Sequence, residues 1–290
     1  MARSNILSTM SYFEPILDHA VVDARNGIDD AATLYRRLGF SLTARGYHTL
    51  GSVNHLAVFQ TNFMELLGWE GDGESPRPEL ARYPTGLNGL VFRADDVDTL
   101  TAAFTNAGLP ARPPDSFSRP VRLPNGAQTD ARFRTVRFEG GTFGSTRLYF
   151  CEHFTPELVW RPDWQHHDNG ALDIARVIIQ AAQPHRLGTL FATMFGEAAT
   201  SLEGDCCVVR ANGVRIEIMP RAEIARAFRD AAPDLGNRDE AMAGLTIRTS
   251  SLATTAAALS AGSIPTMQIG NERILVPASA ALNVMLEFAL

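Results

Sequence analysis

A histidine and a glutamate stand out in this sequence because each interrupts a short apolar stretch. His19 lies in LDHAVV and Glu65 lies in FMELLGW, and both stretches have the apolar composition of short buried strands. Because alternate residues of a strand share a face, each polar side chain is expected on an otherwise apolar face. A carboxylate in such a place is costly unless it is paired or metal-bound. The two residues could therefore bind a divalent metal ion or transfer a proton.

Simpler explanations exist for these residues and for other polar clusters. His19 and Glu65 could hydrogen-bond each other, or Glu152 in LYFCEH, as satisfied polar groups without a metal. Three histidines in or beside a polar segment are expected in a solvated loop: His153, His166 and His167. Three arginines of one expected strand could meet an anionic substrate, but the pattern favours a solvent-facing strand edge: Arg132, Arg134 and Arg137.

The elements that would position these residues recur along the chain. Segments 17–40 and 87–109 each begin as a short apolar strand, continue as a helix with an apolar face and end at a glycine. Two weaker copies begin at Ile174 and Ala243. Each helix is followed by short strands separated by turn residues, most clearly at the hairpin dipeptide Asn212-Gly213. The order strand, helix and about three strands thus occurs four times.

The repeat divides the chain into two halves. Segment 12–155 holds the first two copies, and segment 171–290 holds two degenerate copies. The polar and aromatic stretch 156–170 is expected to be the linker between them. Within the first half, segment 110–126 contains five prolines and is expected to be a long loop.

Composition excludes several classes of protein. The net charge of −6 argues against a nucleic-acid partner or an anionic membrane surface. No apolar run approaches the roughly 18 residues that span a bilayer, and the N-terminus shows no secretory signal. The odd cysteine count is a poor disulfide framework and fits a reducing cytosol, so a cytoplasmic protein is expected. Phosphate-binding glycine loops, nucleophile elbows and Cys-x-x-Cys pairs are absent from the sequence.

The repeat and its best stretch, LDHAVV followed by AATLYRRLGF and FMELLGW, resemble the vicinal-oxygen-chelate superfamily, and more narrowly its glyoxalase-like members. The closing LYFCEHFTPELVW of the first half also looks like that group. The resemblance implies an α+β fold of four βαβββ modules, paired into two curved mixed sheets that enclose cavities. It also implies a divalent metal ion, held by residues on the first and last strand of each module.

Residue by residue, the resemblance assigns three metal ligands. His19 and Glu65 match the ligand positions of the first module, and Glu152 matches the last-strand carboxylate of the second. Gly89 stands where many members carry a histidine. One imidazole and two carboxylates suit Zn, Mn, Fe or Ni. Glu65 and Glu152 are also the expected catalytic carboxylates.

Two further residues, His48 and Asn54 in GYHTLGSVNHL, match the glyoxalase-like pattern and are expected to bind the substrate at the cavity mouth. A polar hairpin turn is the alternative. The implied function is a metal-dependent lyase, isomerase or dioxygenase that acts on a small organic molecule. The alternative function is a metal-free binding or sequestering protein of the bleomycin-resistance type. Whether the modules pair within one chain or between the chains of a homodimer stays open.

The second half lacks the same ligands. Arg176 stands at the position of His19, and Glu217 and Glu287 stand at the carboxylate positions. A guanidinium stays protonated and offers no lone pair to a metal. We therefore expect Arg176 to pair with Glu217 inside the second cavity. The first half is then the working half.

Overall fold

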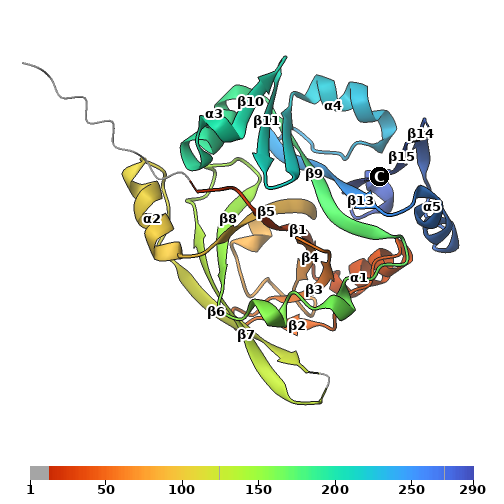
Figure 1. Ribbon diagram of the computed structural model, residues 1–290, viewed down its shortest axis with the longest axis horizontal. Helices are drawn as coiled ribbons and strands as arrows, with labels where there is room; N and C mark the ends of the chain where they lie inside the picture. Colours follow the sequence, from red (N-terminus) through yellow and green to blue (C-terminus); the bar gives the residue numbers. More distant parts are fainter. Residues whose placement is uncertain (1–12, 124, 271) are drawn as a thin grey trace, which may run out of the picture.

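The computed structural model describes residues 13–123, 125–270 and 272–290 (Figure 1). Tyr12, the first residue of the expected N-terminal unit, lies outside these ranges. The elements of the first half are β1 (Leu17–Arg25), α1 (Ile28–Arg37), β2 (Gly46–Tyr47), β3 (Val53–Val58), β4 (Phe63–Gly68), η1 (Leu80–Arg82), β5 (Gly86–Ala94), α2 (Val97–Asn106), β6 (Asp115–Arg122), β7 (Gln128–Arg137) and β8 (Arg147–His153). Two short 3-10 turns follow, η2 (Pro156–Leu158) and η3 (Pro162–Trp164).

The second half repeats the pattern. Its elements are β9 (Ala171–Ala181), α3 (Pro184–Phe195), η4 (Glu197–Ala199), β10 (Thr200–Glu203), β11 (Cys206–Ala211), β12 (Val214–Met219), α4 (Arg221–Phe228), η5 (Arg229–Ala231), β13 (Glu240–Thr249), α5 (Leu252–Ala261), β14 (Met267–Ile269), β15 (Arg273–Val276), η6 (Ala278–Ala280) and β16 (Met285–Ala289). Within the described ranges, no helix is long and apolar enough to cross a membrane.

The strands form two eight-stranded mixed sheets, one from each half of the chain. Their orders are β2-β3-β4-β1-β5-β8-β7-β6 and β10-β11-β12-β9-β13-β16-β15-β14. In each sheet two modules join through their antiparallel first strands, β1 with β5 and β9 with β13. All four first strands lead into a helix, as the repeat predicts. The expected α+β fold of four βαβββ modules is confirmed.

The first sheet curls until its two edge strands approach each other. Beside β2, the backbone N–H of Thr49 donates to the carbonyl oxygen of Ser118 on β6 at 2.9 Å. The segment 110–126 therefore contains an edge strand and not only the loop that its prolines predict. Pro120 is tolerated on β6 because an edge strand has one row of backbone groups without a ladder partner. This closure encloses the space on the concave side of the sheet.

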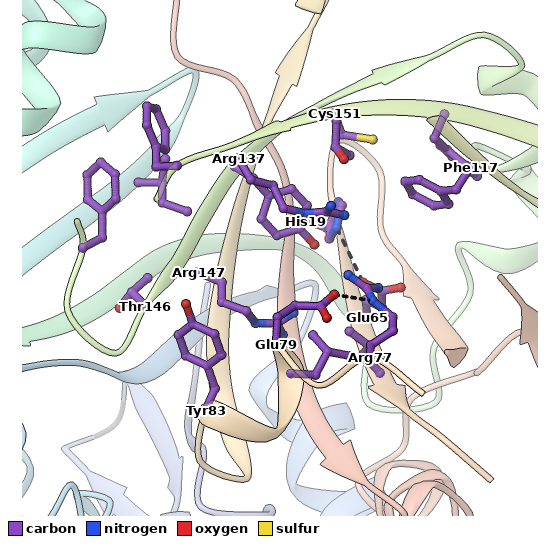
Figure 2. Close-up of a pocket in the computed structure, with 18 of the residues that line it drawn as sticks. His19, Glu65, Arg77, Glu79, Tyr83, Phe117, Arg137, Thr146, Arg147 and Cys151 are labelled. Carbon is purple, nitrogen blue, oxygen red and sulfur yellow. Dashed lines mark hydrogen bonds and ion pairs between the residues drawn. The ribbon is translucent and has the colours of Figure 1, made fainter. Parts of the chain in front are cut away.

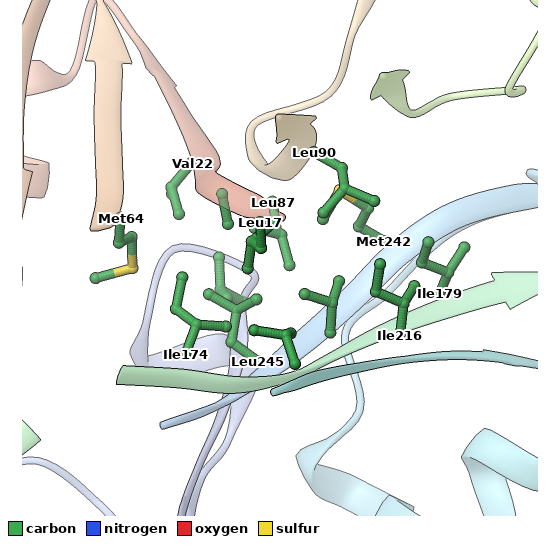
Figure 3. Close-up of a cluster of buried hydrophobic side chains, with 14 of the residues drawn as sticks. Leu17, Val22, Met64, Leu87, Leu90, Ile174, Ile179, Ile216, Met242 and Leu245 are labelled. Carbon is green, nitrogen blue, oxygen red and sulfur yellow. The ribbon is translucent and has the colours of Figure 1, made fainter. Parts of the chain in front are cut away.

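The two sheets pack against each other through their outer faces. Side chains of the first sheet, among them Val22 and Leu90, meet side chains of the second sheet, such as Ile179 and Leu245 (Figure 3). Each such aliphatic side chain contributes roughly 1.5–3 kcal/mol on burial. Because strand side chains alternate, the neighbours of these core residues must point to the opposite, inner face. On β1 the inner face carries His19 and Val21.

Candidate functional site

A cavity of about 430 Å³ lies on the inner face of the first sheet (Figure 2). Strands of both modules line it, together with the segment around η1 and the loop before β8. Aromatic side chains form much of its apolar wall: Phe63, Phe117, Phe133 and Tyr149. His19, Glu65, His48 and Asn54 also lie on this wall, so the structure brings four of the sequence-predicted residues together.

His19 is held by a carboxylate that a β-bulge places beside it. Leu17 pairs with Phe92 and His19 with Val91, so Asp18 is an extra residue on β1. The bulge allows the Asp18 carboxylate to reach Nδ1 of His19, at 2.7 Å. Because an ionised carboxylate can only accept, Nδ1 carries the proton of this contact, and Nε2 is the nitrogen that points away from Asp18. The ring also stacks on Phe63, at 4.3 Å between centroids.

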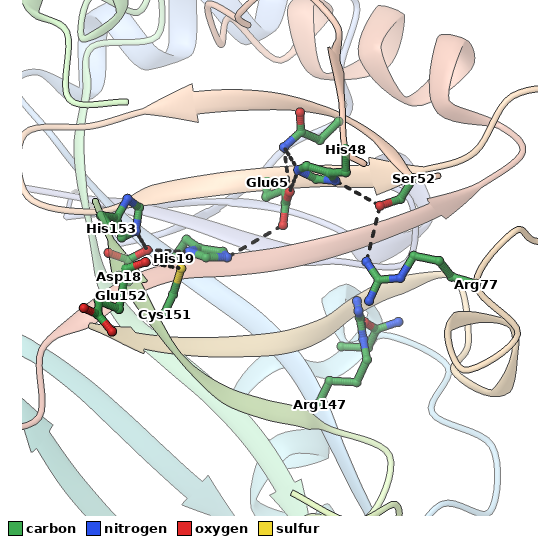
Figure 4. A network of polar contacts seen from close by, with 12 residues as sticks. Asp18, His19, His48, Ser52, Glu65, Arg77, Arg147, Cys151, Glu152 and His153 are labelled. Atoms are coloured by element: carbon green, nitrogen blue, oxygen red, sulfur yellow. Dashed lines mark hydrogen bonds and ion pairs between the residues drawn. The ribbon is translucent and has the colours of Figure 1, made fainter. Parts of the chain in front are cut away.

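Glu65 faces Nε2 of His19 from the neighbouring strand β4. Its Oε2 lies 3.7 Å from Nε2 of His19 (Figure 4). Its Oε1 accepts a hydrogen bond of 2.7 Å from the side-chain amide of Asn54. Burial alone would raise the pKa of Glu65, but His19, His48 and the Asn54 amide together hold it below the usual value. Glu65 is therefore an ionised carboxylate and not a base with a raised pKa.

His48 supports the same carboxylate from a greater distance. Its Nδ1–H donates to Oγ of Ser52 at 2.9 Å, and its Nε2 accepts from the Asn54 amide at 3.2 Å. Burial lowers the pKa of His48 to about 4, which agrees with a neutral ring. His48 and Asn54 thus fix the orientation of Glu65 in addition to lining the cavity.

Glu152 does not join these residues. On β8 the side chains of Tyr149 and Cys151 face the cavity, so Glu152 points to the other side of the sheet. Its Oε2 accepts from the backbone N–H of Val97, at the start of α2, at 3.1 Å. The strand register explains the difference from the expected ligand. Val21 pairs with Glu65, and the equivalent Val91 pairs with Tyr149, so Tyr149 occupies the position expected for Glu152.

Replacement of Glu152 by alanine is expected to lower the free energy of unfolding by about 0.5–1.5 kcal/mol, the usual net value of one hydrogen bond. Occupancy of the cavity by any small molecule or metal ion should not change. Urea denaturation and metal analysis of the purified variant would measure both effects. Loss of metal or small-molecule binding in a folded variant would show that Glu152 belongs to the site.

The four strand positions that the family resemblance assigns to a metal do not form a complete ligand set here. They carry His19, Glu65, Gly89 and Tyr149. Gly89 has no side chain, and a Cβ added there would lie 2.6 Å from Cβ of Val21. Burial raises the pKa of Tyr149, so its phenol stays protonated and is a poor ligand. Two donors remain, which does not fit the expected site of His19 with two carboxylates.

A second polar cluster lies behind His19. Ligand atoms of Asp18, Cys151 and His153 all lie within 4.8 Å of one another, so this group could hold a metal ion. Nε2–H of His153 donates to Asp18 at 3.0 Å, and the contact with this carboxylate raises the pKa of His153 against the effect of burial. Burial alone would raise the pKa of Asp18, but the contacts with His153 and His19 keep it well below the usual value.

The expectation of a solvated loop holds for one of the three histidines. His153 lies at the end of β8 against the cavity, and His166 is exposed. The ring of His167 bridges the backbone of Ser41 and Val58 and is partly buried. Among the three arginines of β7, Arg132 is exposed and Arg134 pairs with Asp98 on the surface. Arg137 instead lines the cavity, contrary to its expected position at a solvent-facing edge.

Sequence patterns also missed other cationic side chains of the cavity. Arg77 comes from the segment before η1, Arg119 from β6 and Arg147 from the first residue of β8. The guanidinium of Arg147 donates twice to the side-chain oxygen of Asn88, at 2.6 and 3.0 Å. No local motif marks these residues, because three distant segments bring them together.

The corresponding position in the second half carries an ion-pair network. Arg176 donates to Glu217 at 3.2 Å and to Glu287 at 2.6 Å. The expected pairing of Arg176 with Glu217 is confirmed, and Glu287 is a second partner. This network occupies the place that His19 and Glu65 occupy in the first half.

Comparisons with known proteins agree with this architecture. A family model described as a glyoxalase-like domain matches residues 17–195, which include every strand around the first cavity. No curated protein matches the chain.

Solved structures of similar fold cover nearly the whole chain. A hypothetical protein from Staphylococcus aureus is 11% identical, with a TM-score of 0.65, over 94% of this chain and 98% of its own. A mutant of 4-hydroxymandelate synthase from Streptomyces coelicolor is 10% identical, with a TM-score of 0.60, over 95% and 92%. A fusion of a xylose isomerase-like TIM barrel with 4-hydroxyphenylpyruvate dioxygenase is 12% identical, with a TM-score of 0.56, over 96% and 48%. At these identities the likeness shows the fold alone.

Proposed function

Because this chain belongs to the glyoxalase-like family of the vicinal-oxygen-chelate superfamily, we propose that it is an enzyme that moves a proton on a small organic molecule in the first-half cavity. One observation carries the proposal. A buried carboxylate, Asp18, fixes the tautomer of His19, and a second carboxylate, Glu65, faces the free nitrogen. An imidazole that is oriented in this way is a common general base.

The proposed step is the removal of a proton from a carbon next to a carbonyl group. Nε2 of His19 forms the new N–H bond, while the electrons of the broken C–H bond move to the carbonyl oxygen and give an enolate. Asp18 and Glu65 stabilise the imidazolium, and the cationic side of the cavity stabilises the enolate. Return of the proton to another carbon gives isomerisation, and loss of a leaving group gives elimination. The reaction class is therefore isomerase or lyase.

A metal-dependent enzyme is the second candidate, and the group of Asp18, Cys151 and His153 favours it. A carboxylate, a thiolate and an imidazole suit zinc best, while manganese, iron and nickel accept parts of this set. Bound there, a divalent ion would supply Lewis-acid polarisation of a substrate oxygen. In the first candidate the same three groups only position His19.

Deuterium exchange tests the proposal. In D₂O the protein is expected to exchange the C–H next to the carbonyl in at least one member of a panel of small neutral and anionic carbonyl compounds, as measured by proton NMR. Exchange should survive exhaustive dialysis against a chelator, because no step needs a metal. Loss of exchange after dialysis, with recovery on adding zinc, manganese, iron or nickel, would favour the metal-dependent candidate. Binding without exchange across the panel would favour the metal-free sequestering protein.

A further inference from the structure

The cavity is cationic although the whole chain is anionic. The chain carries a net charge of −6, yet arginines outnumber carboxylates among the residues that line the cavity. The arginines are Arg77, Arg82, Arg112, Arg119, Arg137 and Arg147, and the acids are Glu65, Glu79 and Glu139. Like charges that share a partly desolvated space repel one another, which favours an anionic occupant.

Three of the six arginines already have a partner. Arg77 pairs with Glu79 at 2.8 Å, and Arg137 pairs with Asp115 at 2.9 Å. Arg147 donates to the neutral amide of Asn88 and lies over the ring of Tyr83, at 5.5 Å from its centroid. These contacts fix the three side chains, which Figure 2 shows around the cavity.

Arg119 differs from these three because it has no partner among the described residues although it is buried. Only 3% of the residue is exposed. Within the described part of the chain, its guanidinium forms neither an ion pair nor a hydrogen bond, and its Nη2 is fully buried. A guanidinium stays protonated in proteins, so this is a buried charge that no acidic group among the described residues contacts, although the Glu65 carboxylate attracts it from farther away. Such a charge is strongly destabilising unless a counter-ion is supplied.

The fold holds Arg119 against the cavity. Its strand β6 forms the edge that approaches β2, and the backbone bond from Thr49 to Ser118 anchors the adjacent residue. Gly46 on β2 leaves room for the guanidinium, because a Cβ there would lie 2.9 Å from Nη1 of Arg119 and 2.4 Å from Oδ1 of Asn54. That Oδ1 is also buried and without a partner among the described residues. Two polar groups are thus left unsatisfied at one end of the cavity.

Aromatic side chains lie beside this unsatisfied end. Phe117, two residues before Arg119 on the same face of β6, stacks on Phe133 with 5.1 Å between ring centroids. The ring of Phe117 also packs edge-on against the ring of His48, with 5.4 Å between centroids. This contact links the aromatic wall to the residues that hold Glu65. An apolar or aromatic body would therefore find contacts next to the guanidinium.

We propose that the cavity binds an organic acid, with its carboxylate on Arg119 and its apolar or aromatic body against Phe117 and Phe133. This inference rests on the proposed function for the location of the chemistry, and it adds the substrate class. A planar carboxylate matches two parallel N–H groups of a guanidinium, and both such pairs include Nη2, so the Arg119 side chain turns its buried Nη2 toward the acid when the acid binds. The Asn54 Oδ1 beside it could accept a hydrogen bond from a hydroxyl or amine of the same ligand.

Matched acids and amides test the inference on the full chain. The probes are benzoate, phenylacetate and 3-phenylpropanoate, each beside its neutral carboxamide, with affinity measured by calorimetry. At least one acid should bind the wild-type protein more tightly than its amide. Arg119→Met should weaken that acid on the order of 10- to 100-fold, because a hydrogen-bonded charge pair is lost. Arg122→Met, on the exposed side of the same strand, should bind as the wild type does.

Two results would overturn the inference: equal binding of acids and amides, including no binding of either, or an unchanged affinity in the folded Arg119→Met variant. The proposed function can fail independently. Exchange on a neutral carbonyl compound without acid binding would support the proposed proton transfer and reject the organic acid as the substrate class. Arg119-dependent acid binding without any exchange would support the acid site and reject the proposed enzymatic function. Where the wild-type protein binds the acid, His19→Gln, which lacks the base, should bind it as well.

Discussion

Replacement of His19 by glutamine is expected to slow deuterium exchange by about 10²–10⁴-fold, the usual contribution of a general base. Glutamine keeps an N–H that can donate to Asp18, so the buried carboxylate keeps a partner. It cannot accept a proton at the position of Nε2, and Glu65 is a poor substitute because its neighbours hold its pKa down. The chemistry should therefore be lost without loss of the fold.

The comparison needs a control and a check on folding. His185→Gln changes an exposed histidine of α3 and should exchange at the wild-type rate. Both variants should melt near the wild-type temperature and bind the best carboxylate of the panel. An exchange rate in folded His19→Gln within a factor of three of the wild-type rate would show that His19 is not the base. A metal content that falls together with the rate would instead favour the metal-dependent candidate.

The repeat made the fold predictable because it needs no knowledge of long-range contacts. Each copy shows a strand that leads into a helix, and four copies predict four modules, while the sequence left open whether the modules pair within one chain or between chains. His19 and Glu65 were found for a related reason. Each is a polar residue in an apolar strand, and a buried polar group must be satisfied by some partner.

Register was the part that the sequence could not provide. LYFCEH contains both Tyr149 and Glu152, and only the pairing of β5 with β8 shows that Tyr149 matches Glu65. A shift by an odd number of residues moves a side chain to the opposite face of the sheet, and this accounts for the misplaced carboxylate. The bulge at Asp18 could not be predicted from the sequence either, because it depends on how β1 pairs with β5. Asp18 was consequently missed as the partner of His19.

Arg119 was missed because its local sequence indicates a loop. Pro113, Pro114 and Pro120 surround it, and prolines are rare in central strands. β6 is the last strand in the order of the first sheet, so Pro120 is acceptable on it, and Arg119 faces inward from this strand. The cationic end of the cavity therefore arises from tertiary structure, which no local pattern reports.

Replacement of Arg176 by methionine is expected to lower the free energy of unfolding by about 3 kcal/mol, at the low end of the cost of breaking a buried ion pair. Arg176 neutralises Glu217 and Glu287, whose side chains are 14% and 2% exposed. The loss is moderated because Arg215 still contacts Glu217 at 2.5 Å, and Arg273 still contacts Glu287 at 2.9 Å. Urea denaturation, followed by circular dichroism, would measure the change.

The same variant separates the roles of the two halves. Arg176 stands at the position of His19 in the repeat but lies on the second sheet, so deuterium exchange by folded Arg176→Met should match the wild type. Arg210→Met, which changes an exposed arginine of β11, should leave both stability and exchange unchanged. The double variant Arg176→Met with Glu287→Gln should recover part of the lost stability, because it also removes a buried charge that has lost one of its two arginine partners. Wild-type stability in Arg176→Met would show that the network is not structural, and loss of exchange in the folded protein would place the working site in the second half.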